Sequence, residues 1–277
     1  MRSFPIIAVI GPTGIGKTKL GVALAKSLNG EVISVDSLQV YRDGGIMTAK
    51  PTLEEMDGVE HHLIDYLEAN EEPSISDFVD CAIEKIKLVQ KRRKVPILVG
   101  GSTSLTKPLL SHPSVRRQEL NVVIMDSDMA GLGPRLDARI DQMVGQGLLD
   151  EARHLYNLER ELRESEKGVR GIWKAIGYPE LRPCFKVDED SPLHYRLMAE
   201  GIAKMKVNTR LFVFRENRVP HYQRMFQKHD GNRVFMKAPR SKLILYPYFF
   251  LMAGTLTSSM YMMGRLVLGH KTWFGKG

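Results

Sequence analysis

The residues best suited to chemistry stand near the start of the chain, where an apolar segment runs into a glycine-rich turn. Residues 6–10 are followed by Gly11-Pro-Thr13-Gly14-Ile-Gly16-Lys17-Thr18 and then by a helical pattern. A strand, a G-x-x-x-x-G-K-T turn and a helix direct successive backbone N–H groups at one spot, which suits a phosphate or diphosphate. Lys17 adds a positive charge there, and the Thr18 hydroxyl can bind Mg²⁺. The turn predicts a phosphate site but specifies no reaction.

Alternating strand and helix patterns predict the elements that position this turn. We expect further strands at 31–35, 96–99 and 121–125, and helices at 19–28, 76–90, 135–158 with a break near 145–147, and 191–215. The alternation predicts an α/β fold, a P-loop-type parallel sheet covered by helices. Ligands bind at the carboxyl ends of such strands. The segments that follow the strands should therefore converge on one site: Gly11–Thr18, Asp36 and Ser37, residues 100–104, and Asp126.

The positive charge is concentrated at the end of the chain. The net charge is +8 over 277 residues, but residues 218–277 hold ten Lys and Arg against one Asp, and residues 1–217 hold 30 against 31 acidic residues. The part that contains the glycine-rich turn therefore has a net charge of −1, which gives no electrostatic footprint for nucleic acid. Cys81 and Cys184 are too few for a disulfide framework or a zinc finger.

We place a domain boundary near residue 217, because the sequence beyond it becomes basic and then apolar. Residues 243–264 carry no formal charge, and a helix of about 22 residues would span about 33 Å, enough for a bilayer core. Lys and Arg flank the segment, and Tyr246, Tyr248 and Trp273 lie near its ends. The sequence predicts a transmembrane helix here, and a buried helix of a soluble protein stays open.

The surroundings of Asp36 indicate a family. Ser34-Val-Asp36-Ser37-Leu-Gln-Val-Tyr, then Thr48-Ala-Lys-Pro-Thr and residues 58–65, stand in order after the glycine-rich turn. Over residues 5–216 this sequence resembles the isopentenyltransferases that prenylate the N6 of adenine. The resemblance implies that the loop binds dimethylallyl diphosphate, and that Mg²⁺ and Lys17 neutralise the leaving diphosphate.

The resemblance also assigns roles to single residues. Asp36 matches the general base that accepts a proton from the adenine amine, which agrees with the need of an attacking amine to lose a proton. Arg139, and with less support Arg135, match basic helix positions that reach the diphosphate. Ser37, Ser102, Thr103 and Asp126 are candidates for nucleotide contacts. The catalytic set is thus Asp36, Lys17, Thr18 and Arg139, and the diphosphate set adds Gly11, Thr13, Gly14, Gly16 and Arg135.

Three features favour a free adenine nucleotide (AMP, ADP or ATP) over tRNA as the acceptor. Residues 100–104 read Gly-Gly-Ser-Thr-Ser, similar to the cytokinin-forming adenylate enzymes, whereas the tRNA enzymes more often read GGTGLY. Only about twenty residues separate Gly101 from the strand at Val122, where the tRNA enzymes carry a long helical insertion. The third feature is the net charge of −1. A tRNA acceptor and a small-molecule kinase remain as alternatives.

The match weakens near its end. Residues 171–178 and Lys206-Val-Asn208-Thr209 fit the family, but Val213 and Arg215-Glu216 stand where Ala and Arg-Gln are expected. From Arg218 the sequence resembles subunit VIIa of cytochrome c oxidase, a single-helix protein of the mitochondrial inner membrane. A genuine fusion and a joined reading of neighbouring genes both fit, and the altered residues favour the second.

The remaining expectations concern residues 218–277, which we call the tail. If it functions, the resemblance implies a membrane location and cytochrome c oxidase as a partner, and the first domain could be an inactive part of a respiratory accessory protein. Without the tail, a cytoplasmic enzyme is expected.

Overall fold

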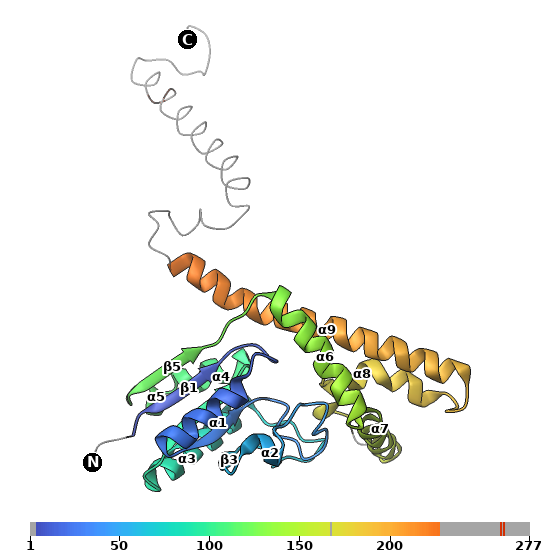
Figure 1. Cartoon of the computed structure of the whole chain (residues 1–277), viewed down its shortest axis with the longest axis horizontal. Coiled ribbons are helices and arrows are strands. Elements are labelled where there is room, and N and C mark those ends of the chain that lie inside the picture. Colours follow the sequence, from blue (N-terminus) through green and yellow to red (C-terminus); the bar gives the residue numbers. More distant parts are fainter. Residues whose placement is uncertain (1–3, 167, 228–260, 262, 264–277) are drawn as a thin grey trace. The chain divides into compact units, whose positions relative to one another are not determined.

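The computed structural model describes residues 4–166 and 168–227, together with Tyr261 and Met263. The chain divides into two compact units, Met1–Arg218 and Val219–Gly277. The first unit contains a parallel sheet whose strands lie in the order β3-β2-β4-β1-β5 (Figure 1). The predicted α/β fold with a parallel sheet is therefore confirmed.

Four of the strands were expected from their apolar runs, and their bounds agree with the prediction to within one residue. The strands are β1 (Ile6–Ile10), β2 (Gly30–Val35), β3 (His61–His62), β4 (Val95–Gly100) and β5 (Leu120–Ile124). The sequence did not predict β3, because two residues are too few to show a periodic pattern.

The four predicted helical segments are present, and further helices that were not predicted lie between them. They are α1 (Lys17–Leu28), α2 (Leu53–Met56), α3 (Ile75–Lys91), α4 (Thr103–Ser111), α5 (Pro113–Arg116), α6 (Met129–Gly145), α7 (Leu148–Glu164), α8 (Tyr178–Leu181) and α9 (Pro192–Gln227), with short 3-10 helices η1 (Ile172–Lys174) and η2 (Arg182–Lys186). The break expected near 145–147 separates α6 from α7, and Gly147 has a φ of 105° at the start of α7.

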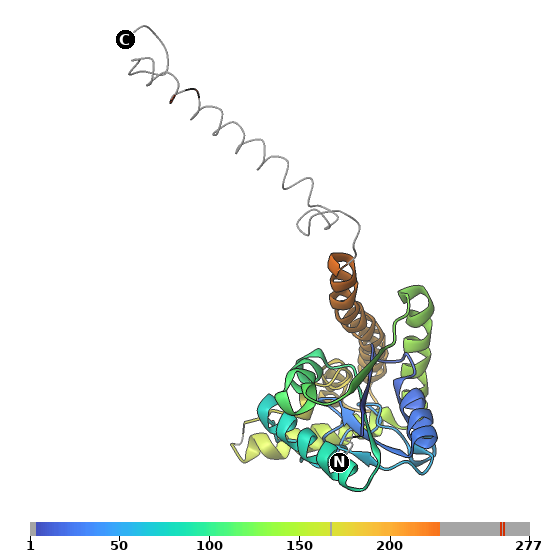
Figure 2. The same cartoon turned by 90° about the vertical axis from the view of Figure 1, so that its left-hand side faces the viewer.

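Side chains of successive sheet residues point to opposite faces, and each face has its own helices. Ile7 and Val9 of β1 pack with Ala25 of α1, whereas Ile6 and Ala8 belong to the larger core that includes Phe78 of α3. The side view shows α1 and the α3–α4 pair on opposite sides of the sheet (Figure 2). The larger core continues into α6, α7 and α8, which therefore pack at one side of the sheet.

A buried carboxylate ties the short strand β3 to its neighbours. Glu31 of β2 has no exposed surface, and it accepts hydrogen bonds from His62 Nε2 (2.7 Å) and from Arg92, while Lys94 Nζ lies 2.8 Å away. Burial alone would raise the pKa of Glu31, but the bonds from Lys94, His62 and Arg92 outweigh burial and lower the pKa from 4.5 to about 2. The charged form of Glu31 is therefore part of the folded structure.

The predicted transmembrane segment, residues 243–264, lies outside the described residues except for Tyr261 and Met263, which are helical. Among the residues that the structure describes, no helix is both long and apolar enough to cross a membrane.

Candidate active site

A cavity of about 640 Å³ lies where the strands end. Its wall includes residues of the glycine-rich loop after β1, of the segment after β2 and of the loop after β4. These strands are adjacent in the sheet, so their carboxyl ends bring the three segments together. Of the segments expected to converge, only Asp126, which follows the edge strand β5, is absent from the residues that line the cavity.

The helix α1 begins without a capping side chain. Gly16 precedes the helix with a φ of 100°, a conformation that residues with a side chain rarely adopt, and no side chain caps the helix. By contrast, α2 and α3 both begin with capping boxes, from Thr52 with Glu55 and from Ser74 with Asp77. Uncapped N–H groups at a helix start favour an anion.

Two cations stand at this end of the cavity. Lys17 Nζ donates to the Pro12 carbonyl oxygen at 2.8 Å, and Arg139 of α6 donates to Thr13 Oγ1 at 3.0 Å. Burial lowers the pKa of the Arg139 guanidinium from its ordinary value, and the charges of Glu55 and Asp36 oppose that shift. Arg139 thus binds the loop that it was predicted to assist, although the two lie more than 120 residues apart in sequence.

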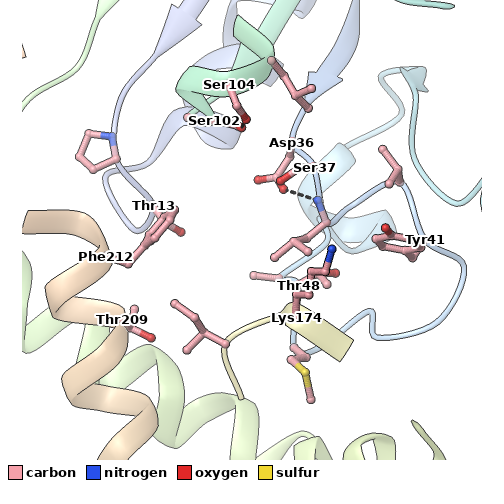
Figure 3. Close-up of a pocket in the computed structure, with 18 of the residues that line it drawn as sticks. Thr13, Asp36, Ser37, Tyr41, Thr48, Ser102, Ser104, Lys174, Thr209 and Phe212 are labelled. Carbon is pink, nitrogen blue, oxygen red and sulfur yellow. Dashed lines mark hydrogen bonds between the residues drawn. The ribbon is translucent and has the colours of Figure 1, made fainter. Parts of the chain in front are cut away.

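Asp36 and Ser37 also line the cavity, and Figure 3 shows them across the open space from Thr13 and Phe212. One carboxylate oxygen of Asp36 accepts a hydrogen bond from the Leu38 N–H at 2.9 Å, drawn as a dashed line. This bond fixes the orientation of the carboxylate and leaves its second oxygen without a bond to the loop backbone. Asp36 can therefore accept a proton from a molecule in the cavity.

The loop after β4 approaches the glycine-rich loop closely. A Cβ on Gly101 would lie 2.6 Å from the Gly11 carbonyl oxygen and 3.3 Å from Lys17 Nζ, so a side chain here would push the two loops apart. Ser102, Thr103 and residues beyond them line the cavity from this loop. The Ser102 and Ser104 hydroxyls are hydrogen-bonded to each other at 2.8 Å.

Apolar side chains from several helices and from the loop around residues 45–49 cover another part of the cavity wall. They include Met47, Phe78, Ile140, Met143, Met205 and Phe212. No sequence pattern connects these residues, because each is an ordinary apolar position of its own segment. Glu151 of α7 accepts hydrogen bonds from the Ile46 and Met47 N–H groups at 2.8 and 2.7 Å and so holds that loop in place.

Lys174 of η1 lines the cavity and pairs with Glu72, which precedes α3. The hydrogen bond from Lys174 is the largest cause of the lowered pKa of Glu72. Figure 3 places Lys174 on the Asp36 side, beyond Thr48. Lys174 lies in the motif at residues 171–178, and the family resemblance assigned no role to this lysine.

The residues of the motif at 206–209 have different roles in the structure. Lys206 pairs with Asp141 of α6 at 2.6 Å, and Asn208 donates to Glu180 of α8 at 2.7 Å, so both residues hold α9 against its neighbours. Thr209 lines the cavity. Val213, where the family pattern was expected to continue with Ala, is fully buried against Leu132 and Leu136.

Some predicted site residues are not in the cavity wall. Arg135 is exposed on α6, and Asp126 is exposed after β5. Gly11, Gly14, Gly16 and Thr18 belong to the glycine-rich loop and the start of α1 but do not themselves line the cavity. The roles given to these residues, like those of the lining residues, stay predictions.

The parallel sheet, the glycine-rich loop at the first turn of α1 and a cavity at the strand ends define a P-loop α/β protein. The family model described as IPP transferase matches residues 39–120 and 106–216. The chain belongs to the IPP transferases, a family of prenyltransferases.

Named relatives and solved structures agree with this assignment. A bifunctional cytokinin biosynthesis protein of Fusarium pseudograminearum is 47% identical over 205 residues, which is 74% of this chain and 42% of that protein. A tRNA dimethylallyltransferase of Streptococcus agalactiae is 32% identical, covering 78% of this chain and 88% of the relative. The structure of a tRNA isopentenylpyrophosphate transferase from Bacillus halodurans has a TM-score of 0.63 and 30% identity, with 82% and 88% of the two chains covered.

The end of the chain matches a second family. The model described as cytochrome c oxidase subunit VII matches residues 217–269, as the sequence resemblance predicted. Within the described part of the chain nothing supports a membrane or an oxidase as a partner, so those two expectations stay predictions.

Proposed function

We propose that this chain transfers the dimethylallyl group of dimethylallyl diphosphate to the N6 of a free adenine nucleotide. The observation that carries the proposal is one cavity in which the glycine-rich loop, the Asp36 carboxylate and an apolar wall meet. Each of the three serves one requirement of the reaction: a site for the leaving diphosphate, a proton acceptor and a dry surface for the prenyl chain.

The glycine-rich loop binds the diphosphate of the donor. When the allylic C–O bond breaks, negative charge gathers on the departing diphosphate. Backbone N–H groups at the uncapped start of α1, together with Lys17 and Arg139, are already in place to receive that charge. Electrostatic stabilisation by groups that need not move is commonly the largest contribution to such a rate.

Magnesium fits the oxygen donors near the loop. The Thr18 hydroxyl, in the first turn of α1, has no hydrogen-bond partner within residues 4–166 and 168–227. Hydroxyl and phosphate oxygens are hard ligands of the kind that Mg²⁺ takes. Thr18 and the donor diphosphate would hold the ion, and the bound ion would supply positive charge to the leaving group.

Asp36 acts as the general base. The N6 amine forms a C–N bond to the allylic carbon as the C–O bond breaks, and the nitrogen then loses a proton to the carboxylate. The Leu38 N–H holds one oxygen of Asp36, which orients the other toward the cavity. The apolar side chains of the cavity, including Phe78, Met143 and Met205, exclude water from the carbon that is attacked.

Three observations support a free nucleotide as the acceptor. The alignment with the Streptococcus relative is 276 positions long, but only about 216 of them, 78% of the 277 residues here, hold a residue of this chain. The other positions, about 60, hold residues of the relative alone, which agrees with the insertion that the tRNA enzymes carry and this chain lacks. Residues 1–217 carry a net charge of −1, which does not favour a polyanion. The Fusarium relative is named a cytokinin biosynthesis protein.

Prenylation of tRNA is the second candidate. It is supported by the Streptococcus relative and by the Bacillus structure, both named for tRNA. The two candidates share the donor site and Asp36 and differ only in the acceptor.

The test offers the acceptors side by side. The purified chain is incubated with Mg²⁺, dimethylallyl diphosphate and either AMP, ATP or unmodified tRNA, and N6-prenyl adenine is measured by mass spectrometry. Product on AMP or ATP supports the proposal. Product on tRNA alone transfers the function to the second candidate, and no product on any acceptor overturns both.

A further inference from the structure

The strand β5 forms an edge of the sheet and exposes aliphatic side chains on both of its faces. It pairs with β1, and no other strand within the described residues reaches its outer edge (Figure 1). Val122, Val123 and Ile124 are 44%, 39% and 65% exposed. Edge strands in soluble proteins commonly carry a charged residue, a proline or a bulge that blocks further pairing. Residues 120–124, Leu-Asn-Val-Val-Ile, contain no such protection.

The backbone hydrogen bonds show which groups of β5 are free to pair. Ile6 N donates to the Glu119 carbonyl oxygen at 2.8 Å, and Met125 N donates to the Ile10 carbonyl oxygen at 2.7 Å. In a parallel ladder the N–H and C=O of one residue point to the same side, and successive residues alternate. The backbone groups of Leu120, Val122 and Ile124 therefore point outward, away from β1.

The charges on either side of β5 differ in sign. Arg116, Arg117 and Glu119 are exposed before the strand and leave that end with a net positive charge, whereas Asp126 and Asp128 are exposed after it. A second β5 strand running antiparallel would bring the basic end of one strand to the acidic end of the other. A parallel arrangement would bring like charges together, which disfavours it.

We propose that β5 is the interface between two copies of this chain. The two strands pair antiparallel about a two-fold axis at Val122, and the sheet continues from one copy into the other. In this register Val122 lies opposite Val122 of the partner subunit, and Leu120 lies opposite Ile124 of the partner subunit. All three outward-facing residues of each edge then find hydrogen-bond partners, and each exposed aliphatic side chain gains a cross-strand neighbour. This interface does not depend on the proposed reaction.

A cysteine at the axis tests the register. Directly opposed residues of a hydrogen-bonded antiparallel pair have Cα atoms about 5.5 Å apart, which is within the range that a disulfide spans. The full chain with Val122→Cys should therefore form a covalent dimer under mild oxidation, seen on a non-reducing gel. The matched control is Leu53→Cys on α2, because Leu53 is 87% exposed and far from β5 in sequence.

The two rates decide the proposal. Preassociation should make the Val122→Cys variant cross-link at least about tenfold faster than the control. The unmodified chain, with Cys81 partly buried and Cys184 buried, gives the background rate. Equal rates for the two variants would show that contact is by chance collision, whatever the tail contributes to association, and would overturn the proposal.

A proline at the same position provides a second, independent measurement. Val122→Pro removes an N–H that points away from β1, so the ladder to β1 loses no bond. Sedimentation velocity of the full chain should change from dimer to monomer, while Val122→Thr, which keeps the N–H, should remain a dimer. An unmodified chain that sediments as a monomer, or a proline variant that remains a dimer, contradicts the inference.

Discussion

Asp36 is the residue on which the proposed chemistry depends most. Its carboxylate is oriented by the Leu38 N–H and faces a cavity that also contains the loop cations. The substitution Asp36→Asn keeps the shape and the hydrogen bond but removes the proton acceptor.

For Asp36→Asn we expect kcat to fall by about 10²–10⁴, the usual contribution of a general base. Binding of dimethylallyl diphosphate should stay nearly unchanged, because the donor contacts the loop and not Asp36. Steady-state kinetics and calorimetric titration of the donor measure the two effects separately. A fall of less than tenfold in kcat would remove Asp36 from its assigned role.

Gly101 is the second residue with a sharp expectation. In Gly101→Ala the new methyl would lie 2.6 Å from the Gly11 carbonyl oxygen, so the two loops must separate. Because Lys17 lies in the same contact, we expect weaker donor binding and a higher KM for the donor, with a smaller change for the acceptor. The control is Gly145→Ala at the end of α6, where a Cβ meets no atom within 4 Å. Equal donor KM values for the two variants would contradict this account of the loop.

At the scale of elements, Glu31 joins β3 to β2 through its hydrogen bond with His62 and also binds Arg92 and Lys94 at the end of α3. The pKa of Glu31 is about 2 in the folded chain against 4.5 ordinarily. A lowered carboxyl pKa stabilises the fold at pH values above the ordinary pKa, and that stabilisation is lost as the pH falls from about 4.5 toward 2. The shift corresponds to roughly 3 kcal/mol at neutral pH.

The variant Glu31→Gln tests this contribution. Its free energy of unfolding in urea should be lower than that of the unmodified chain at pH 7, and the difference should shrink by pH 3. Asp57→Asn serves as the control, because the Lys26–Asp57 pair is exposed and such pairs contribute little. A difference for Glu31→Gln that stays constant between pH 7 and pH 3 would contradict the assigned ionisation.

Elements with a strong local pattern could be predicted from the sequence, and those formed by distant contacts could not. A local pattern in the sequence is enough to predict the apolar strand β1, the glycine-rich loop and the amphipathic helix α3. The two-residue strand β3 forms by pairing with β2, and its His62 bonds Glu31 of that strand, but no local pattern connects the two segments. The same holds for the site: Lys17 and Asp36 stand in recognisable motifs, whereas Met143 and Phe212 line the cavity only because α6 and α9 pack there.

At the scale of the whole molecule, the question is what residues 219–277 add to the first unit. Every residue in the described part of the chain that lines the cavity lies between Pro12 and Val213. The last helix of the unit is held from within it, by Lys206 to Asp141 and by Arg210 to Asp137, both on α6. The described contacts that shape the cavity therefore all lie before Arg218.

We accordingly expect a chain that ends at Arg218 to keep its kcat/KM to within about twofold of the full chain, a change of less than 0.5 kcal/mol in transition-state stabilisation. A chain that ends at Asn208 is the matched control. It lacks Thr209 and Phe212 of the cavity wall and the buried Val213, and it should lose activity.

If the Arg218 chain is folded by circular dichroism but inactive, the tail takes part in the reaction. If the full chain is inactive as well, the first unit is an inactive domain, as an accessory protein of the respiratory chain would require. Activity that persists without the tail makes the first unit an enzyme in its own right, whatever the second family contributes.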